Sequence, residues 1–401
     1  MTQVGVKDAL LDAQTLRTMG SAPYGGADIG ECLTAAARVR GTDLTSWYDA
    51  WFSTATAALD LAERELAAGR TETARLAFWR ASSYFRTSGV MLMGTPTDPR
   101  LADASRRQTD AFRRGAALLA APPQILQIPY EGTTLPGYFF PAGHGQQRQA
   151  TVILTGGYDG TAEELYFFNG AAALARGYHV LAFDGPGQGA ALLQQGLVLR
   201  PDWENVVTPV VDYLLTRPDV DAGRIALIGL SLGGYLAPRA ASGEHRLAAC
   251  IADCGSYDLF AAALERIPGA LARGLTDTRG TAAAVLRRVL RVLERKPTAG
   301  WALRRGQQVH GAADPVSYLR SLRDYTLKGR AAKIACPVFV CNAEGDDISR
   351  SAPQLAAALT CANEFVTFTA AEGAGDHCEA GARTLYHARS FGWLDRTLHP
   401  H

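Results

Sequence analysis

Three features are missing from this sequence of 401 residues: a long apolar run, a strong net charge and a paired-cysteine motif. The formal charge is only +1, so no global field would attract nucleic acid or an anionic membrane surface. No stretch approaches the roughly 18 uninterrupted apolar residues of a membrane span, and residues 1–20 lack the apolar centre of a signal peptide. We therefore expect neither nucleic acid nor a membrane as a partner.

The seven cysteines are an odd number, and none of them forms a CxxC pair. The closest pairs are Cys250 with Cys254 and Cys336 with Cys341, and neither spacing is that of a zinc or redox motif. We interpret the cysteines as free thiols in a reducing cytoplasm. The sequence therefore predicts a cytoplasmic location, no metal and no cofactor.

The first part of the chain is predicted to be helical throughout. Apolar residues recur every three or four positions over residues 47–66 and again over 74–85, which predicts a helical hairpin. Asp98 and Pro99 then form a typical helix start, with an acidic cap followed by proline in the first turn. We expect residues 1–121 to form a helical N-terminal domain.

The pattern changes after residue 123, where short strand-like segments begin to alternate with helical ones. Two extended runs predict a hairpin, and the alternation that follows predicts a mostly parallel sheet with helices on both faces. The strands are expected at 124–130, 135–140, 151–154, 179–183, 225–228, 247–251, 338–341 and 365–369, and the helices between them include one over 162–176. Because the alternation lapses in a helical stretch and then resumes, we expect a sheet core, an inserted helical cap and the end of the core, at residues 122–255, 256–330 and 331–401.

The strongest chemical signal is the sequence Gly-Leu-Ser-Leu-Gly-Gly at residues 229–234. It follows the strand-like run 225–228 and opens a predicted helix, as a nucleophile elbow does. Such a turn lifts the serine hydroxyl out of the sheet and aims the N-terminus of the new helix at the site. This context predicts that Ser231 is a nucleophile, whereas the same string elsewhere in a glycine-rich chain would be a weak signal.

A serine hydroxyl becomes a good nucleophile only when a base removes its proton. After a serine elbow the expected chain order is acid and then histidine, and His377 lies in a loop just past the last predicted strand. The acid is expected after the preceding strand, where Glu344, Asp346 and Asp347 lie close together. Asp346 fits best because an apolar residue stands two positions after it, and Asp347 and Glu344 stay open as alternatives.

Attack on a carbonyl builds negative charge on its oxygen, which preorganised N–H donors stabilise. The backbone N–H of Leu232 is one predicted donor, because it lies at the start of the helix after the elbow. The second is expected in the glycine-rich loop 155–160, from Gly157 or Tyr158. Together these groups would form an oxyanion hole.

The motifs resemble those of the α/β-hydrolases related to 2,6-dihydroxypseudooxynicotine hydrolase and the FrsA-like esterases. Besides the elbow, the resemblance rests on residues 156–160 (GGYDG), 183–189 (FDGPGQG) and 373–379 (GAGDHCE). Helical segments such as 81–86 (ASSYFR) resemble that group as well, so the match covers nearly the whole chain. The resemblance implies an α/β-hydrolase fold with an eight-stranded type of sheet, a metal-free enzyme that forms a homodimer, and a substrate held between core and cap.

Several aromatic and polar residues are candidates for binding a small-molecule substrate. Asp159, Tyr235 and Tyr257 lie near the carboxyl ends of predicted strands, where ligands bind in open α/β sheets. The helical domain and the cap supply three more candidates: Trp47, Tyr84 and His310. Each of these residues also has an ordinary structural interpretation, in an aromatic core or on a solvated helix face.

Three functions are compatible with this set of residues. The first is hydrolysis of a small ester, thioester or activated ketone through an acyl intermediate on Ser231. The second uses the same residues for acyl transfer or cyclisation in natural-product (polyketide-type) biosynthesis, which a closed apolar pocket would favour by excluding water. The third is a ligand receptor built on a retired hydrolase fold. The presence of Ser231, His377 and an acid together counts against the receptor, because a retired site usually loses a member.

Overall fold

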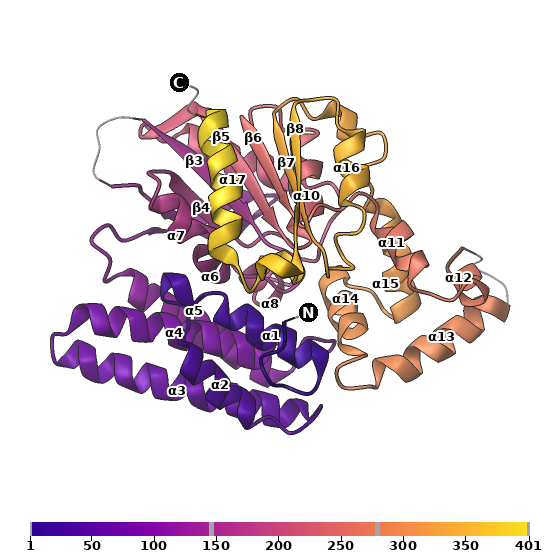
Figure 1. Cartoon of the computed structure of the whole chain (residues 1–401), viewed down its shortest axis with the longest axis horizontal. Coiled ribbons are helices and arrows are strands. Elements are labelled where there is room, and N and C mark those ends of the chain that lie inside the picture. The colour runs from indigo at the N-terminus through magenta and orange to yellow at the C-terminus, as the bar shows by residue number, and fades with distance from the viewer. Residues whose placement is uncertain (1, 144–147, 277–280, 399–401) are drawn as a thin grey trace.

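The computed structural model describes residues 2–143, 148–276 and 281–398, and its centre is an eight-stranded sheet (Figure 1). The strand order is β1-β2-β4-β3-β5-β6-β7-β8. β2 is antiparallel to β1 and to β4, and the remaining neighbours are parallel. The strands are β1 (Gln124–Tyr130), β2 (Thr133–Phe140), β3 (Gln149–Thr155), β4 (His179–Phe183), β5 (Val220–Leu230), β6 (Ala249–Asp253), β7 (Val338–Ala343) and β8 (Asn363–Phe368).

Helices cover both faces of this sheet, because its central strands are continuous apolar runs rather than alternating ones. Ile153 and Leu227 belong to the hydrophobic core that also contains side chains of α9, α10 and α16. Val152 and Ile228 belong to a second core, shared with α6, α7 and α17. The covering helices are α6 (Ala162–Leu165), α7 (Ala171–Leu174), α9 (Glu204–Leu215), α10 (Gly233–Ala241), α16 (Ala352–Ala358) and α17 (Arg383–Leu398).

The N-terminal region is entirely helical within its described residues and lies below the sheet in Figure 1. The predicted hairpin is formed by two long helices that pack on each other, and Asp43 and Asp98 cap the starts of α3 and α5 through their side chains. Trp47 and Phe85 are fully buried in the resulting core. The helices are α1 (Ala9–Met19), α2 (Ile29–Ala37), α3 (Leu44–Ala67), α4 (Thr71–Val90) and α5 (Pro99–Ala116).

A second helical segment lies between β6 and β7 and forms the lobe at the right of Figure 1. Its last long helix reaches back to the N-terminal region, where the Trp301 indole N–H donates to the Val90 carbonyl at 2.9 Å. The helices are α11 (Leu259–Glu265), α12 (Gly269–Thr276), α13 (Thr281–Glu294), α14 (Trp301–His310) and α15 (Pro315–Ser321). We call α11 to α15 the cap helices.

The observed elements differ from the predicted ones in three places. The helix expected over 162–176 is interrupted by a π-helical turn at Tyr166–Gly170. The strand expected at 247–251 is observed at Ala249–Asp253, where its pairing with the neighbouring strand continues to Asp253 opposite Cys341. A short helix, α8 (Gly189–Leu193), had no local signal. Among the described residues, we find no helix whose length and apolar character would allow it to cross a membrane.

Candidate active site

Ser231 lies on the turn between β5 and α10. Its φ angle is +63°, a left-handed backbone conformation that is strained for a residue with a side chain. A Cβ at Gly229 would lie only 1.9 Å from the Gly233 carbonyl oxygen, so only glycine allows the helix to start this close to the strand. The sharp turn expected from the sequence is therefore present, and it holds the serine hydroxyl at the carboxyl edge of the sheet.

The structure brings Ser231, His377 and Asp346 together in a hydrogen-bonded chain. His377 Nε2 lies 2.9 Å from Ser231 Oγ, and its Nδ1 lies 2.8 Å from Asp346 Oδ2. The other two acids that the sequence left open make different contacts. Asp347 binds Arg350, and Glu344 accepts a hydrogen bond from the Ala370 N–H. Of the three acids, only Asp346 is placed within hydrogen-bond distance of the imidazole.

The glycine-rich loop after β3 lies directly against the elbow. A Cβ at Gly157 would stand 2.8 Å from Ser231 Cβ and 2.9 Å from the Leu232 nitrogen. Within the described part of the chain, the N–H groups of Leu232 and Tyr158 donate no hydrogen bond, so both stay available to a ligand. The Leu232 nitrogen and the glycine-rich loop that carries Gly157 and Tyr158 are thus both next to the serine.

A comparison with known proteins bears on this arrangement. A family model described as the alpha/beta hydrolase family matches residues 144–385, which is more than half of the chain. The chain belongs to the α/β-hydrolase family. The serine elbow, the histidine loop and the acid loop of this hydrolase all lie within the matched residues.

Fungal hydrolases are similar to this α/β-hydrolase along nearly their whole length. The hydrolase LUC6 of a Fusarium species is 39% identical, over 96% of this chain and 95% of the relative. The 20-hydroxy-prefusarin hydrolase FUS2 of Gibberella moniliformis is 37% identical, again over 96% and 95%. The crystal structure of 2,6-dihydroxy-pseudo-oxynicotine hydrolase superimposes with a TM-score of 0.74 at 24% identity, covering 95% of this chain and 96% of its own. The expected fold, with its helical N-terminal region, is confirmed.

The electrostatics of the hydrogen-bonded chain favour an ionised acid beside the imidazole. Burial would raise the pKa of Asp346, but the charge and hydrogen bond of His377 and the Ile348 N–H hold it well below its ordinary value. Burial in turn lowers the pKa of His377, while Cys378 and the Asp346 carboxylate raise it further than burial lowers it. Asp346 therefore both orients the imidazole and stabilises its protonated form.

Asp159, in the same glycine-rich loop, is held by three arginines from distant parts of the hydrolase. Its Oδ2 atom lies 3.1 Å from Arg17 Nη1, 3.6 Å from Arg86 Nη2 and 3.4 Å from Arg305 Nη1. These side chains come from α1, α4 and α14, and Glu164 binds the first two of them. Burial would raise the pKa of Asp159, but the three cations hold it well below its ordinary range. The network ties both helical segments to the loop beside Ser231.

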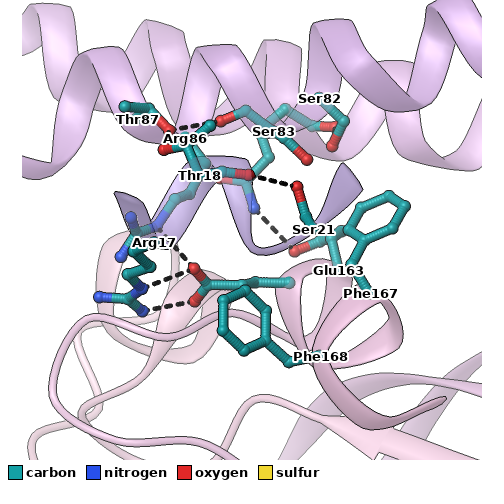
Figure 2. A pocket seen from close by; sticks show the side chains of 12 residues that line it. Arg17, Thr18, Ser21, Ser82, Ser83, Arg86, Thr87, Glu163, Phe167 and Phe168 are labelled. Atoms are coloured by element: carbon teal, nitrogen blue, oxygen red, sulfur yellow. Dashed lines mark hydrogen bonds and ion pairs between the residues drawn. The ribbon is translucent and has the colours of Figure 1, made fainter. Parts of the chain in front are cut away.

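The cavity beside this network is small, and most of the residues around it are polar. Figure 2 shows Arg17 and Arg86 pointing into it, with Ser82 and Glu163 on its other sides. Its volume is about 20 Å³, which is room for about one water molecule. Burial and the charge of Arg17 lower the pKa of Arg86 to about 10, which indicates a tightly enclosed cation. This cavity is therefore part of the interface between the helical region and the core, not a substrate pocket.

Tyr158 connects the same loop to the cap helices through its side chain. Its hydroxyl lies 2.9 Å from His310 Nε2, and Ser321 Oγ lies 3.0 Å from the other ring nitrogen. Burial lowers the pKa of His310 to about 4, so the imidazole is neutral near pH 7. Tyr158 and the predicted pocket residue His310 thus contact each other where the cap meets the glycine-rich loop.

The remaining pocket candidates have structural contacts. Tyr235 is fully buried and its ring packs on Tyr325, while Tyr257 joins the cap through the bond from the Leu327 N–H to its carbonyl. Trp47 donates to the Thr87 carbonyl at 2.8 Å, and Tyr84 donates to Glu31 at 2.7 Å. Both of these side chains are fully buried inside the helical region. The structure therefore corrects Trp47 and Tyr84 from pocket residues to core residues, because packing between α3 and α4 encloses them.

Two groups of side chains have the composition of metal ligands. Ligand atoms of Cys254, His377 and Cys378 lie within 4.8 Å of one another, as do those of Asp253, Cys341 and Glu379. In the second group a cation is already present, because Arg383 Nη1 lies 3.1 Å from Asp253 Oδ2 and 3.7 Å from Glu379 Oε2. The first group contains the imidazole of His377, which also contacts Ser231 and Asp346.

No pattern in the sequence indicated the contacts made by Arg17, Arg305 and the thiols of Cys254 and Cys378. The two arginines are only two of 40 lysine and arginine residues, and neither belongs to a motif. The two thiols are 124 positions apart in the chain yet lie 3.4 Å from each other. Residues this far apart in the chain show no periodic signal, so only the folded chain identifies them.

Proposed function

We propose that this α/β-hydrolase is a serine hydrolase that cleaves a small-molecule ester, thioester or activated ketone through an acyl intermediate on Ser231. The observation that carries the proposal is the pair of distances at His377, 2.9 Å to Ser231 Oγ and 2.8 Å to Asp346 Oδ2. A base between a nucleophile and an orienting acid is what acyl transfer to a serine requires. The relatives named as hydrolases support the reaction class.

The proposed reaction proceeds in two half-reactions. Ser231 Oγ attacks the substrate carbonyl carbon while its proton passes to His377 Nε2. The oxygen of the tetrahedral intermediate carries the negative charge and accepts from the N–H groups of Leu232 and Tyr158 or Gly157, each worth about 3 kcal/mol of barrier. The imidazolium then gives its proton to the leaving group as the bond to that group breaks.

In the second half-reaction, water attacks the acyl group on Ser231. His377 accepts a proton from this water and returns it to the serine oxygen, which releases the acid product and the free enzyme. The side chain of His377 is 36% exposed, so water reaches the imidazole in the structure as it stands. This exposure supports hydrolysis over acyl transfer or cyclisation, which would require water to be excluded.

The substrate is proposed to be a small organic molecule. One relative is named for a hydroxylated compound, 20-hydroxy-prefusarin, and its similarity covers 96% of this chain. The cap helices and the N-terminal region meet over the glycine-rich loop through His310 and Arg305. This enclosure supports a substrate that fits under the cap rather than a polymer.

Labelling with a fluorophosphonate, followed by intact mass measurement, tests the proposal. We expect one adduct on the wild type and on Ser242→Ala, a buried serine that binds the Arg239 carbonyl, and none on Ser231→Ala or His377→Ala. Turnover of short p-nitrophenyl esters should fall by about 10⁴-fold or more in the two unlabelled variants. An adduct on Ser231→Ala, or an unlabelled wild type that still turns over the esters, would refute the assignment.

A further inference from the structure

We propose that Cys254, Cys378 and His377 form a binding site for a thiophilic divalent cation of the Zn²⁺ class, and that an ion bound there switches the hydrolase off. The inhibitory part of this inference rests on the proposed function, because it concerns the base of the proposed triad. The binding part is independent of that function.

The distances between the ligand atoms are close to those of a tetrahedral zinc site. Cys254 Sγ lies 3.4 Å from Cys378 Sγ and 3.4 Å from His377 Nδ1. Bonds of about 2.3 Å to sulfur and 2.0 Å to nitrogen imply edges of about 3.8 Å between two sulfurs and about 3.5 Å between sulfur and nitrogen. The ligand atoms would therefore move apart by a few tenths of an ångström to admit the ion.

Two separate loops supply these ligands at one point. Cys254 follows β6, and Cys378 follows the histidine in the loop after β8, with a left-handed φ of +53°. Their ligand atoms and that of His377 lie within 4.8 Å of one another, a set of two sulfurs and one nitrogen that leaves one tetrahedral position to solvent. Thiolate and imidazole ligands in tetrahedral geometry select zinc over magnesium or calcium.

The ligand set balances the charge of such an ion. Two thiolates and a neutral imidazole around a divalent cation carry no net charge. The Arg383 guanidinium donates to the Cys378 carbonyl at 2.7 Å, but it is already paired with Asp253 and Glu379. Cys254 is fully buried and Cys378 is 4% exposed, while the His377 side chain is 36% exposed. The ion would therefore enter past the imidazole.

Occupation of the site would disable His377 through its tautomer. A neutral imidazole carries one proton, and in the proposed triad that proton is on Nδ1, facing Asp346, which leaves Nε2 free to accept from Ser231. A cation on Nδ1 forces the proton to Nε2, where the lone pair is then no longer available. Binding would release the two thiol protons to solvent, and no oxidation or reduction takes place.

The test uses the full-length protein, freed of metal with EDTA and kept reduced with a phosphine. We expect the wild type to bind one Zn²⁺ per chain by elemental analysis after gel filtration. Co²⁺ should give the visible absorption of a tetrahedral thiolate complex. Ester turnover and fluorophosphonate labelling should both fall at least tenfold on loading with zinc, and EDTA should restore them.

Variants decide whether these residues are the ligands. Cys254→Ser and Cys378→Ser should each need at least 100-fold more zinc for half-maximal binding, whereas Cys361→Ser, a half-buried thiol elsewhere, should bind as the wild type does. Cys254→Ala gives the same test if serine is not tolerated at that buried position. Each variant is compared with its own metal-free activity.

The outcomes separate this inference from the proposed function. Zinc binding and the cobalt spectrum are also measured on Ser231→Ala, which is expected to lack turnover. Zinc binding by this variant supports the cation site whether or not the hydrolase proposal holds. The inference is overturned if the wild type binds no stoichiometric zinc, or if Cys254→Ser and Cys378→Ser bind it unchanged. The inference is also overturned if ester turnover is lost in metal-free buffer and a reductant, rather than EDTA, restores it.

Discussion

The carboxyl edge of the sheet and the junction of the two helical segments are built in different ways. At the sheet edge, Ser231, Asp346 and His377 each follow a strand within a short motif, and their contacts are 2.8 to 2.9 Å long. At the junction, Arg17 and Arg305 reach Asp159 from helices that no motif connects. The reacting groups are thus positioned by local turns, whereas the enclosure of the site depends on charges that are paired across the whole chain.

The two regions also differ in what stabilises them. The sheet edge tolerates a strained backbone at Ser231, because the strands and helices around it are packed on both sides. The junction instead removes the charges of Asp159 and Arg86 from water. The desolvation free energy that this costs is offset by their ion pairs only while every partner is present. We therefore expect substitutions at the sheet edge to affect turnover, and substitutions at the junction to affect stability.

Among the substitutions that compare the two regions, the largest effect is expected from Asp346→Asn, which keeps the shape of the acid but loses its charge. Turnover should fall by roughly 10³- to 10⁴-fold, because the amide favours the wrong imidazole tautomer. The pKa of His377 should also fall once the carboxylate that raises it is gone. Since the neutral imidazole is the active form and is lost as the pH falls through this pKa, the acidic limb of the residual pH–rate profile should shift to lower pH.

The control for this substitution is Asp347→Asn, at a side chain that is 66% exposed and binds only the neighbouring Arg350 in the structure. We expect its turnover to stay within about twofold of the wild type, since an exposed ion pair contributes little. Steady-state kinetics on a p-nitrophenyl ester measure both variants. An equal loss of turnover in Asp347→Asn would contradict the assignment of the acid role to Asp346.

An intermediate effect is expected from Gly157→Ala, where the two regions touch. The added Cβ would lie 2.8 Å from Ser231 Cβ, so the loop must move away from the elbow. We expect turnover to fall about 100-fold, because one N–H donor to the oxyanion is displaced. Gly160→Ala, whose Cβ would meet nothing closer than 3.4 Å, is the matched control. Similar turnover in the two variants would show that the loop does not donate to the oxyanion.

The smallest effect on turnover is expected from Asp159→Asn, in the junction itself. The buried Arg86 and the half-buried Arg17 and Arg305 would lose their shared partner, so the free energy of unfolding should fall by about 3 kcal/mol while turnover falls less than tenfold. Urea titration of folding and ester kinetics at the same pH measure the two quantities. Glu72→Gln, at an exposed carboxylate that pairs with Arg75, should change stability by less than about 1 kcal/mol. If Asp159→Asn lost turnover more than tenfold while its free energy of unfolding stayed unchanged, the distinction between the two regions would be contradicted.

Much of the fold could be predicted from local patterns in the sequence. The alternation of strands and helices, the helical N-terminal region and the position of the elbow depend on residues within about a dozen positions of each other. The predicted strand 225–228 lies inside β5, and the expected hairpin of 124–130 and 135–140 is formed by β1 and β2. The prediction of a regular helix at 162–176 missed the π-helical turn at Tyr166–Gly170, because such a turn gives no periodic signal in the sequence.

The sequence by itself determined the fold, the serine elbow, the histidine loop and a choice of three acids, because each is encoded by a short segment and its backbone preference. The tertiary structure alone decided that Asp346 is the acid within reach of His377. It also decided that Trp47 is a core residue and that Cys254 and Cys378 meet behind the imidazole. These outcomes depend on how whole helices and strands pack, and a contact between residues more than a hundred positions apart is set by that packing rather than by either local sequence.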